Sequence, residues 1–204
     1  MIYELRTYTL KPGGVPEFEA RFEEVLPYRE KYSKLAGFWH TEIGPLNQVV
    51  HLWAYEDLRH RTEARAAAAQ DPHLPPKVEH LFVGAEAEVL IPAPFMRPLE
   101  PRQMGSIYEM RIYTYQHRTI PEVLKRWEAA IAFREQFSPL AGCWYTELGG
   151  LDKLIHLWPY ADFAERERVR RESRQEGRWP PATREFLVRQ ENKLLIPAPF
   201  SPLR

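Results

Sequence analysis

Three ionisable residues that could perform acid–base chemistry occur twice in the chain, 105 positions apart. The two sets are Glu4, Arg6 and His51, and then Glu109, Arg111 and His156. A histidine near a carboxylate can serve as a general base, and an arginine can stabilise a developing oxyanion. Because both sets stand in matching contexts, any site in one half of the chain is expected to have a counterpart in the other.

The same residues also have structural interpretations. Glu4 and Arg6 share one strand face and could pair with charges on a neighbouring strand, because buried charges need partners. His51 and His156 each precede a Leu-Trp pair and could be hydrogen-bonded locally inside a sheet. Metal sites need several ligands at set spacing, and the chain has no His-x-His or His-x-x-x-His pair. A structural network and a ligand role therefore both stay open, and no metal site is expected.

Longer segments repeat at the same offset. Residues 2–9, 35–42, 51–55 and 91–95 return at 107–114, 140–147, 156–160 and 196–200, the last pair letter for letter. The alignment needs no gap, and a period this long indicates duplicated domains, because solenoid repeats are much shorter. We expect a first domain at residues 1–97, a linker at 98–105 and a second domain at 106–204.

Each half reads as strand, helix, strand, strand, helix and strand. Alternating, Tyr- and Thr-rich or turn-bounded runs predict the strands, which in the first half cover residues 2–10, 38–43, 48–55 and 86–91. Pro16 suits the start of the first helix, and Asp57, like Asp162 in the second half, suits an N-cap of the second helix. This order predicts a ferredoxin-like α+β unit whose antiparallel sheet carries helices on one face.

Such a unit leaves the other face of its sheet bare, which soluble monomers avoid. We expect the two bare faces to meet and the sheets to close into a barrel around a pseudo-twofold axis. The strand faces with Leu5, Ile43, Val50 and Leu52 suit packing beneath the helices. Trp39 and Trp144 are likewise expected between helix and sheet, as core anchors.

The opposite strand faces are then expected to line the barrel. Besides the two ionisable sets, they carry candidate ligand-binding residues, namely Tyr8, Glu42, Trp53 and Tyr55, and Tyr113, Glu147, Trp158 and Tyr160. A polar and aromatic interior of this kind is typical of a ligand pocket. Arg29 and Arg134, with a glutamate after each, are expected on a solvated helix face or at an interface, and the arginine-rich run at 166–174 is expected to be ordinary helix charge patterning.

Three ordered motifs resemble those of the NIPSNAP family. They are Tyr-Glu-Leu-Arg-x-Tyr from Tyr3, Gly-x-Trp-x-Thr-Glu-x-Gly from Gly37 and His-Leu-Trp-x-Tyr from His51, and each returns in the second half with Met110 in place of Leu5. The resemblance implies a dimeric α+β barrel, a group that includes cofactor-free monooxygenases and isomerases. For an enzyme it implies proton abstraction near a carbonyl or phenol. The histidine would be the base, the glutamate its orienting group and the arginine the oxyanion stabiliser.

Composition narrows the choice of partners. The 28 basic and 28 acidic residues balance, which argues against nucleic acid or an anionic membrane as a partner. The single Cys143 excludes a disulfide framework, and the absence of a signal or transit pattern leads us to expect a cytoplasmic protein. The chain has no Gly-rich phosphate loop and no zinc-binding spacing, so no cofactor is expected.

The sequence thus favours the binding or conversion of a small, partly hydrophobic organic molecule inside the barrel, with cofactor-free monooxygenase- or isomerase-like chemistry as one form of conversion. The alternative is a non-catalytic interaction module with a filled barrel, whose outer helices contact partner proteins. The outer surfaces also leave room for a homo-oligomer. An open cavity lined by the repeated polar residues would favour the first hypothesis, and a solidly packed barrel would favour the second.

Overall fold

The computed structural model describes residues 1–204. In the first half, the elements are β1 (Ile2–Leu10), α1 (Val15–Arg29), β2 (Lys34–Ile43), β3 (Gln48–Tyr55), α2 (Leu58–Ala68) and β4 (Phe82–Pro92). In the second half, they are β5 (Ile107–Tyr115), α3 (Ile120–Arg134), β6 (Gly142–Leu148), β7 (Lys153–Tyr160), α4 (Phe163–Glu172) and β8 (Leu187–Pro197). The predicted order of elements is confirmed in both halves, although β2 and β4 begin earlier than the sequence indicated.

Local signals explain where the helices begin. A proline lies in the first turn of both α1 and α3, where its missing N–H leaves no hydrogen bond unmade. The predicted N-caps are confirmed, because the Asp57 carboxylate accepts from the backbone N–H of His60 and that of Asp162 from Glu165, each at 2.8 Å. The same devices at twin positions give the two halves one fold.

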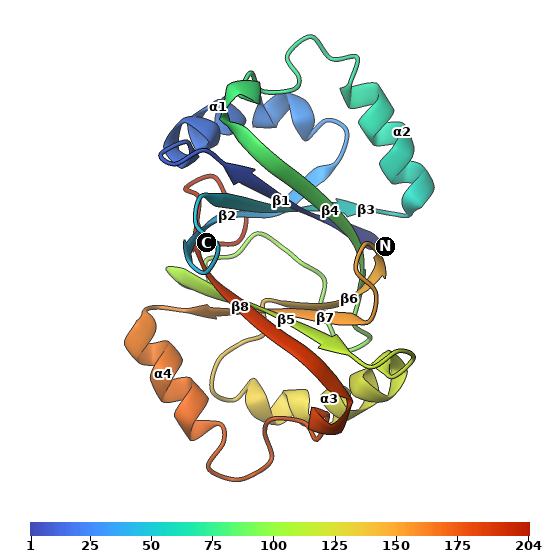
Figure 1. Cartoon of the computed structure of the whole chain (residues 1–204), viewed down its shortest axis with the longest axis vertical. Helices are drawn as coiled ribbons and strands as arrows, with labels where there is room; N and C mark the ends of the chain where they lie inside the picture. The colour runs from blue at the N-terminus through green and yellow to red at the C-terminus, as the bar shows by residue number, and fades with distance from the viewer.

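The eight strands close into a single barrel in the order β1-β3-β2-β8-β5-β7-β6-β4. Two antiparallel pairs join the halves, β2 with β8 and β4 with β6. The helices lie outside, with α1 and α2 above the barrel and α3 and α4 below it in Figure 1. The expected intramolecular α+β barrel is therefore confirmed, and neither half has a free sheet edge.

The core of the barrel is apolar and draws on both halves. It includes Leu5, Val50 and Leu52 from the first half and Leu157 from the second, all almost completely buried. Aromatic rings meet across the halves, with Trp39 against Tyr108 at 5.7 Å between centroids and their twins, Trp144 and Tyr3, at 5.8 Å. The inner faces thus supply the hydrophobic burial that joins the two domains.

This arrangement reverses the strand faces expected from the sequence. Leu5, Val50 and Leu52 point into the barrel instead of packing beneath the helices, and Trp39 and Trp144 lie with them. Ile43, placed on the same face, is about half exposed near the end of β2. The face that carries Glu4, Arg6 and His51 is covered by the helices instead of lining the barrel.

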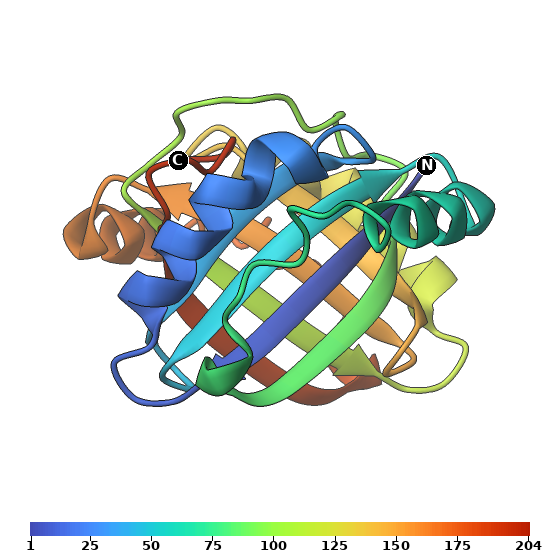
Figure 2. The same ribbon diagram turned by 90° about the horizontal axis from the view of Figure 1, so that it is seen from above.

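The segment between β4 and β5 covers one end of the barrel, at the top of Figure 2. Met96, Leu99 and Met104 pack against the barrel core. The backbone N–H of Arg102 donates to the Pro202 carbonyl at 2.8 Å, so the linker is held against the C-terminal residues. None of the helices is long and apolar enough to span a membrane.

Candidate ligand-binding pockets between sheet and helices

Each half holds a cavity between the outer face of its sheet and its two helices. The first has a volume of about 370 Å³ and the second about 340 Å³, within the range of about 300–1,000 Å³ that small-molecule sites occupy. In the first half, β1 and β3 form the floor, α1 and α2 the walls, and the segment 74–82 the rim. Because the repeats align without a gap, the two cavities use equivalent positions.

His51 forms part of the floor of the first pocket. Its Nδ1 lies 2.7 Å from the indole nitrogen of Trp53, two residues along the same strand face. An indole N–H only donates, so Nδ1 accepts and the neutral ring carries its proton on Nε2. That Nε2 atom is buried and has no hydrogen-bond partner in the protein.

The histidine is held in its neutral form. Burial is the largest cause, and the charges of Arg6, Arg29 and Arg65 add to it, so the pKa of His51 lies well below its ordinary value. A neutral ring that carries its proton on Nε2 can donate a hydrogen bond but has no free basic nitrogen. Trp53, and not Glu4, orients the ring, so the expected arrangement of base and orienting carboxylate is not formed.

Glu4 is instead the centre of an arginine cluster. Its carboxylate, which is fully buried, accepts from Arg6 at 2.9 Å and from Arg61 on α2 at 2.6 Å, while Arg65 approaches to 3.6 Å. Burial alone would raise the pKa of Glu4, but the hydrogen bond from Arg61 and the charges of the three arginines outweigh it, so the pKa is lowered. The carboxylate is therefore ionised and fully engaged.

Two further donors complete the first pocket. Arg6 Nε donates to the Tyr8 hydroxyl at 2.6 Å, which leaves the phenolic proton of Tyr8 free to donate in turn. Arg29 of α1 lies over the Trp53 ring, 4.4 Å from its centroid, and donates to the hydroxyls of Ser33 and Tyr55. Arg29 thus donates its hydrogen bonds to neutral oxygens, which do not balance its positive charge.

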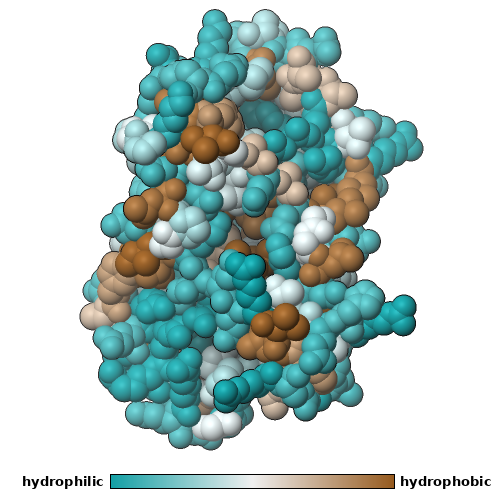
Figure 3. All heavy atoms as spheres, viewed as in Figure 1, coloured by the Kyte–Doolittle hydropathy of each residue, from teal (hydrophilic) through white to brown (hydrophobic).

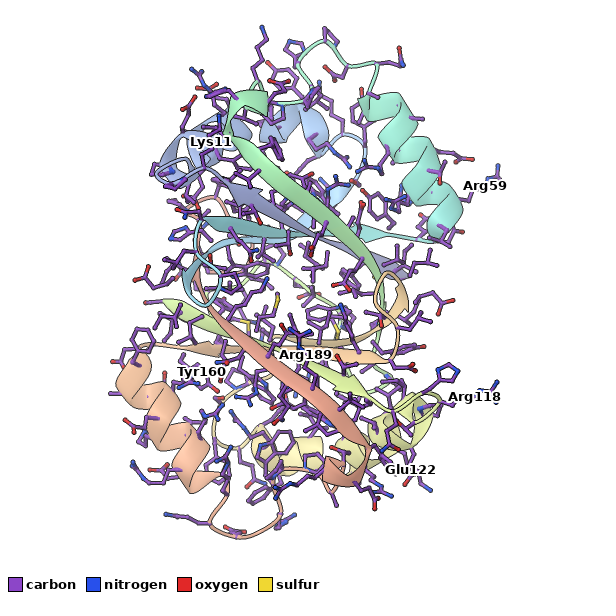
Figure 4. All side chains as sticks on the ribbon, in the orientation of Figure 1. Lys11, Arg59, Arg118, Glu122, Tyr160 and Arg189 are labelled. Atoms are coloured by element: carbon purple, nitrogen blue, oxygen red, sulfur yellow. The ribbon has the colours of Figure 1, made fainter.

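The second pocket repeats this arrangement. His156 Nδ1 accepts from Trp158 at 2.7 Å, and the buried Nε2 again has no partner. Glu109 accepts from the three arginines Arg111, Arg166 and Arg170 at 2.8, 2.7 and 3.0 Å. Arg134, only 3% exposed, donates to Ser138 and Tyr160 and stacks 4.1 Å from the Trp158 ring centroid. Tyr160 lies beside α4 in Figure 4.

The structure brings together most of the residues singled out from the sequence, but not all of them. Arg6, Tyr8, His51 and Trp53 line the first pocket, and their twins line the second with Glu109 and Tyr160. Glu4 and Tyr55 lie beside the first pocket, joined to its arginines. Glu42 and Glu147 are exposed on β2 and β6 and line neither pocket.

Sequence reasoning missed the arginines that the helices contribute. Arg29 and Arg134 are not on a solvated face, since both line pockets. Arg166 and Arg170 hold Glu109, as Arg61 and Arg65 hold Glu4. Repetition in the sequence could have revealed them, because each of these arginines has an arginine 105 positions away.

The inner part of each pocket consists mainly of hydrogen-bond donors. Histidine N–H, tyrosine O–H and arginine N–H groups surround the space, and the central carboxylate is consumed by arginines. Such a set suits a carboxylate or another anionic oxygen. It offers no obvious group to remove a proton.

Two ferredoxin-like halves that close one barrel, each with a pocket beneath its helices, place the chain in the class of dimeric α+β barrels. A monooxygenase-like protein from Fusobacterium nucleatum shares this fold, with a TM-score of 0.72, 9% identity and coverage of 96% of this chain and 91% of that chain. At that identity the likeness shows the fold alone. The NIPSNAP family model matches residues 3–97 and again 108–202, so the chain belongs to the NIPSNAP family.

The curated relatives agree with that assignment. The human protein NipSnap homolog 3A is 33% identical over 217 residues, which cover all of this chain and 86% of that protein. A NIPSNAP domain protein of solved structure from Burkholderia xenovorans is 35% identical and matches 48% of this chain and all of its own, with a TM-score of 0.46.

Proposed function

We propose that each half of the chain binds a small organic acid in the pocket between its sheet and its helices. The acid group would contact the arginine of the first helix of each half, Arg29 or Arg134, and the N–H of the floor histidine, His51 or His156. The organic part would lie against the aromatic and aliphatic walls. The proposal moves the ligand out of the barrel, where the sequence had suggested it, because the repeated polar residues face the helices.

The observation that supports this proposal most strongly is the pair of arginines at the twin positions 29 and 134. A charge removed from water is costly unless it is paired, yet the guanidinium groups of the buried Arg134 and the half-buried Arg29 bond only neutral oxygens and stack on a tryptophan. An anionic ligand would supply the missing charge. The unpartnered Nε2–H of the neighbouring histidine would gain an acceptor from the same ligand.

The same donors would also stabilise an enolate or phenolate oxygen. Conversion of a ligand in the manner of an isomerase or cofactor-free oxygenase is therefore the finer form of the proposal, and it suits a substrate that arrives already ionised. The alternative, an interaction module, has the packed barrel in its favour. The open pockets lined by repeated charged residues favour ligand binding over that alternative.

Isothermal titration calorimetry with octanoate, and with octanol as a neutral ligand with the same tail, tests the proposal. Arg29→Gln keeps a hydrogen-bonding group beside Ser33 and Tyr55 but removes the charge. We expect it to weaken octanoate binding at the first pocket by at least about tenfold, so that one of two octanoate sites is lost from the titration, and to leave octanol binding unchanged, because a charge-assisted hydrogen bond contributes about 1.5–3 kcal/mol.

Arg59→Gln is the matched control. Arg59 lies on α2, points away from the sheet in Figure 4, and has a side chain that is 86% exposed. Its substitution should leave octanoate binding unaltered. Failure of the parent protein to bind octanoate, equal binding of octanol and octanoate, or two octanoate sites of unchanged affinity in the folded Arg29→Gln variant would each overturn the proposal.

A further inference from the structure

Among the equivalent positions at which the two pockets differ, four on their rims and walls differ in charge or in the presence of a hydroxyl group. The first-half residues Ala68, Ala69, Val78 and Glu79 correspond to Ser173, Arg174, Thr183 and Arg184 in the second half. Every one of these differences replaces an apolar or acidic side chain with a polar or basic one. The remaining arginine, histidine and tyrosine positions of the floor are shared.

These differences change the charge of the second pocket. In the first half, the three arginines that line the pocket face two carboxylates, Glu79 on the rim and Glu4 beneath the floor. In the second half, five arginines line the pocket and Glu109 is the one carboxylate among them. The second pocket is therefore much more positive, and its additional charges stand at the mouth, where Arg174 and Arg184 are exposed.

The second pocket also holds two unpartnered polar groups that the first lacks, the Trp127 indole N–H and the Ser173 hydroxyl. The Ser173 hydroxyl is buried, at 1% exposure, and has no hydrogen-bond partner, as is true of His156 Nε2 in the same pocket. Ala68, at the position of Ser173, offers no such group. A buried hydroxyl without a partner costs free energy, so its presence beside an arginine-rich cavity points to a ligand oxygen.

We infer that the second pocket binds a small organic molecule with a doubly charged oxyanion group, a phosphate monoester or a dicarboxylate, whereas the first binds a monoacid with an apolar body. The inference rests on the proposed function and assigns ligand classes to its two sites. Arginine suits both oxyanions, because its fork of donors matches their paired oxygens. Trp179, which replaces Leu74 and lies 5.1 Å from Trp127 between ring centroids, offers an aromatic wall for the organic part.

Calorimetric titrations at pH 8 with phenyl phosphate, succinate and the singly charged phenylacetate test this inference. Phenyl phosphate is doubly charged there, because the second pKa of a phosphate monoester is about 6. We expect phenyl phosphate or succinate, or both, to bind more tightly than phenylacetate. The two ligands distinguish a phosphate from a dicarboxylate, and binding of neither would overturn the inference.

The double variant R174A/R184E gives the second pocket the residues of the first at its two mouth positions. Both positions are exposed, so the fold should tolerate the change. We expect binding of the doubly charged ligand to weaken by about tenfold or more, since both positive charges at the mouth are lost and one of them is replaced by a negative charge. Octanoate binding at the first pocket should persist. Unchanged affinity for phenyl phosphate and succinate would overturn the inference.

Ser173→Ala distinguishes a ligand-binding role of the hydroxyl from a structural one. If the hydroxyl serves a ligand, the variant should bind the doubly charged ligand several-fold more weakly while keeping the thermal stability of the ligand-free protein. Lower thermal stability with unchanged affinity would contradict the role assigned to Ser173.

The reciprocal variant A69R/E79R should give the first pocket measurable affinity for the same doubly charged ligand, and failure to do so would count against the inference. The two proposals can fail separately. Octanoate binding that Arg29→Gln weakens, without any preference for phenyl phosphate or succinate, would leave the proposed function standing and remove only the assigned ligand class.

Discussion

At the scale of single residues, each pocket histidine is fixed by the tryptophan two positions along its strand. The indole N–H occupies Nδ1, and the low pKa keeps the ring neutral. These two constraints assign His51 and His156 a donor role and remove the general-base role that the sequence suggested. Any proton abstraction at these sites would have to begin with a group other than the histidine.

The pH dependence of stability tests this assignment. The folded-state pKa of His51 and of His156 lies well below that in the unfolded chain, about 6.5, so the unfolded state binds more protons as the pH falls below that value. Stability from these residues is therefore fully present above about pH 6.5 and is lost on acidification, by up to about 1.4 kcal/mol per pH unit for each histidine. Urea titrations between pH 7 and 5 would measure this loss.

His51→Gln/His156→Gln is the matched variant, because glutamine can accept from the indole and donate in turn without titrating. We expect its unfolding free energy to fall less over that range. His40 titrates with the opposite sign, because its hydrogen bond to Glu19 raises its pKa, but it is present in both proteins and cancels in the difference. Parallel pH profiles would show that the histidines are not held neutral.

At the scale of elements, a glycine two residues before each barrel tryptophan makes room for its indole. A Cβ on Gly37 would lie 1.9 Å from the Trp39 ring, and one on Gly142 would lie 2.0 Å from the Trp144 ring. Both rings are almost completely buried and cannot move aside easily. The Gly-x-Trp pattern is thus a packing requirement of the barrel interior.

Gly37→Ala should lower the free energy of unfolding by about 1–3 kcal/mol, the usual cost of overpacking a core. Gly84→Ala, in the exposed part of β4, is the control, because a Cβ there would meet nothing within 4 Å. Urea unfolding followed by tryptophan fluorescence gives both values. Equal stability of the two variants would show that the barrel interior can adjust around Trp39.

The strands, helices and turns could be predicted because their signals are local. Asp57 and Asp162 cap helices through their own neighbours, and the alternation along β1 is visible in the sequence itself. The direction of the faces could not be predicted, because in this barrel both faces of a strand are buried. Leu5 enters the barrel core while Glu4, next to it, is fully buried beneath the helices.

The candidate site was predictable in part for the same reason. The strand residues His51, Trp53 and Arg6 stand out by type and by repetition. The helix residues Arg29 and Arg65 look like ordinary surface arginines, since helices often carry charged residues on their exposed faces. Only the closure of helices over the sheet shows that their long side chains reach inward to the pocket.

At the scale of the whole molecule, a shared barrel core joins the two halves, while the outward faces offer less apolar surface for contacts between chains. Apolar residues form separate small patches on the largely hydrophilic face in Figure 3. Leu46 and Leu151, on twin hairpin turns, are among the exposed ones. Association of whole chains through such outer surfaces stays a prediction, whereas the joining of the two halves is built into the strand order.

Because the halves are joined by two strand pairs and by one core, we expect the whole chain to unfold in a single transition. Phe18→Ala in α1 and Ile131→Ala in α3 each weaken a helix–sheet cluster of one half, at a cost of about 2–5 kcal/mol. In scanning calorimetry each variant should move the one transition downward by several degrees, with calorimetric and van't Hoff enthalpies equal. Two transitions, one of which stays in place when Phe18 is replaced, would show that the halves unfold independently and that the barrel core does not couple them.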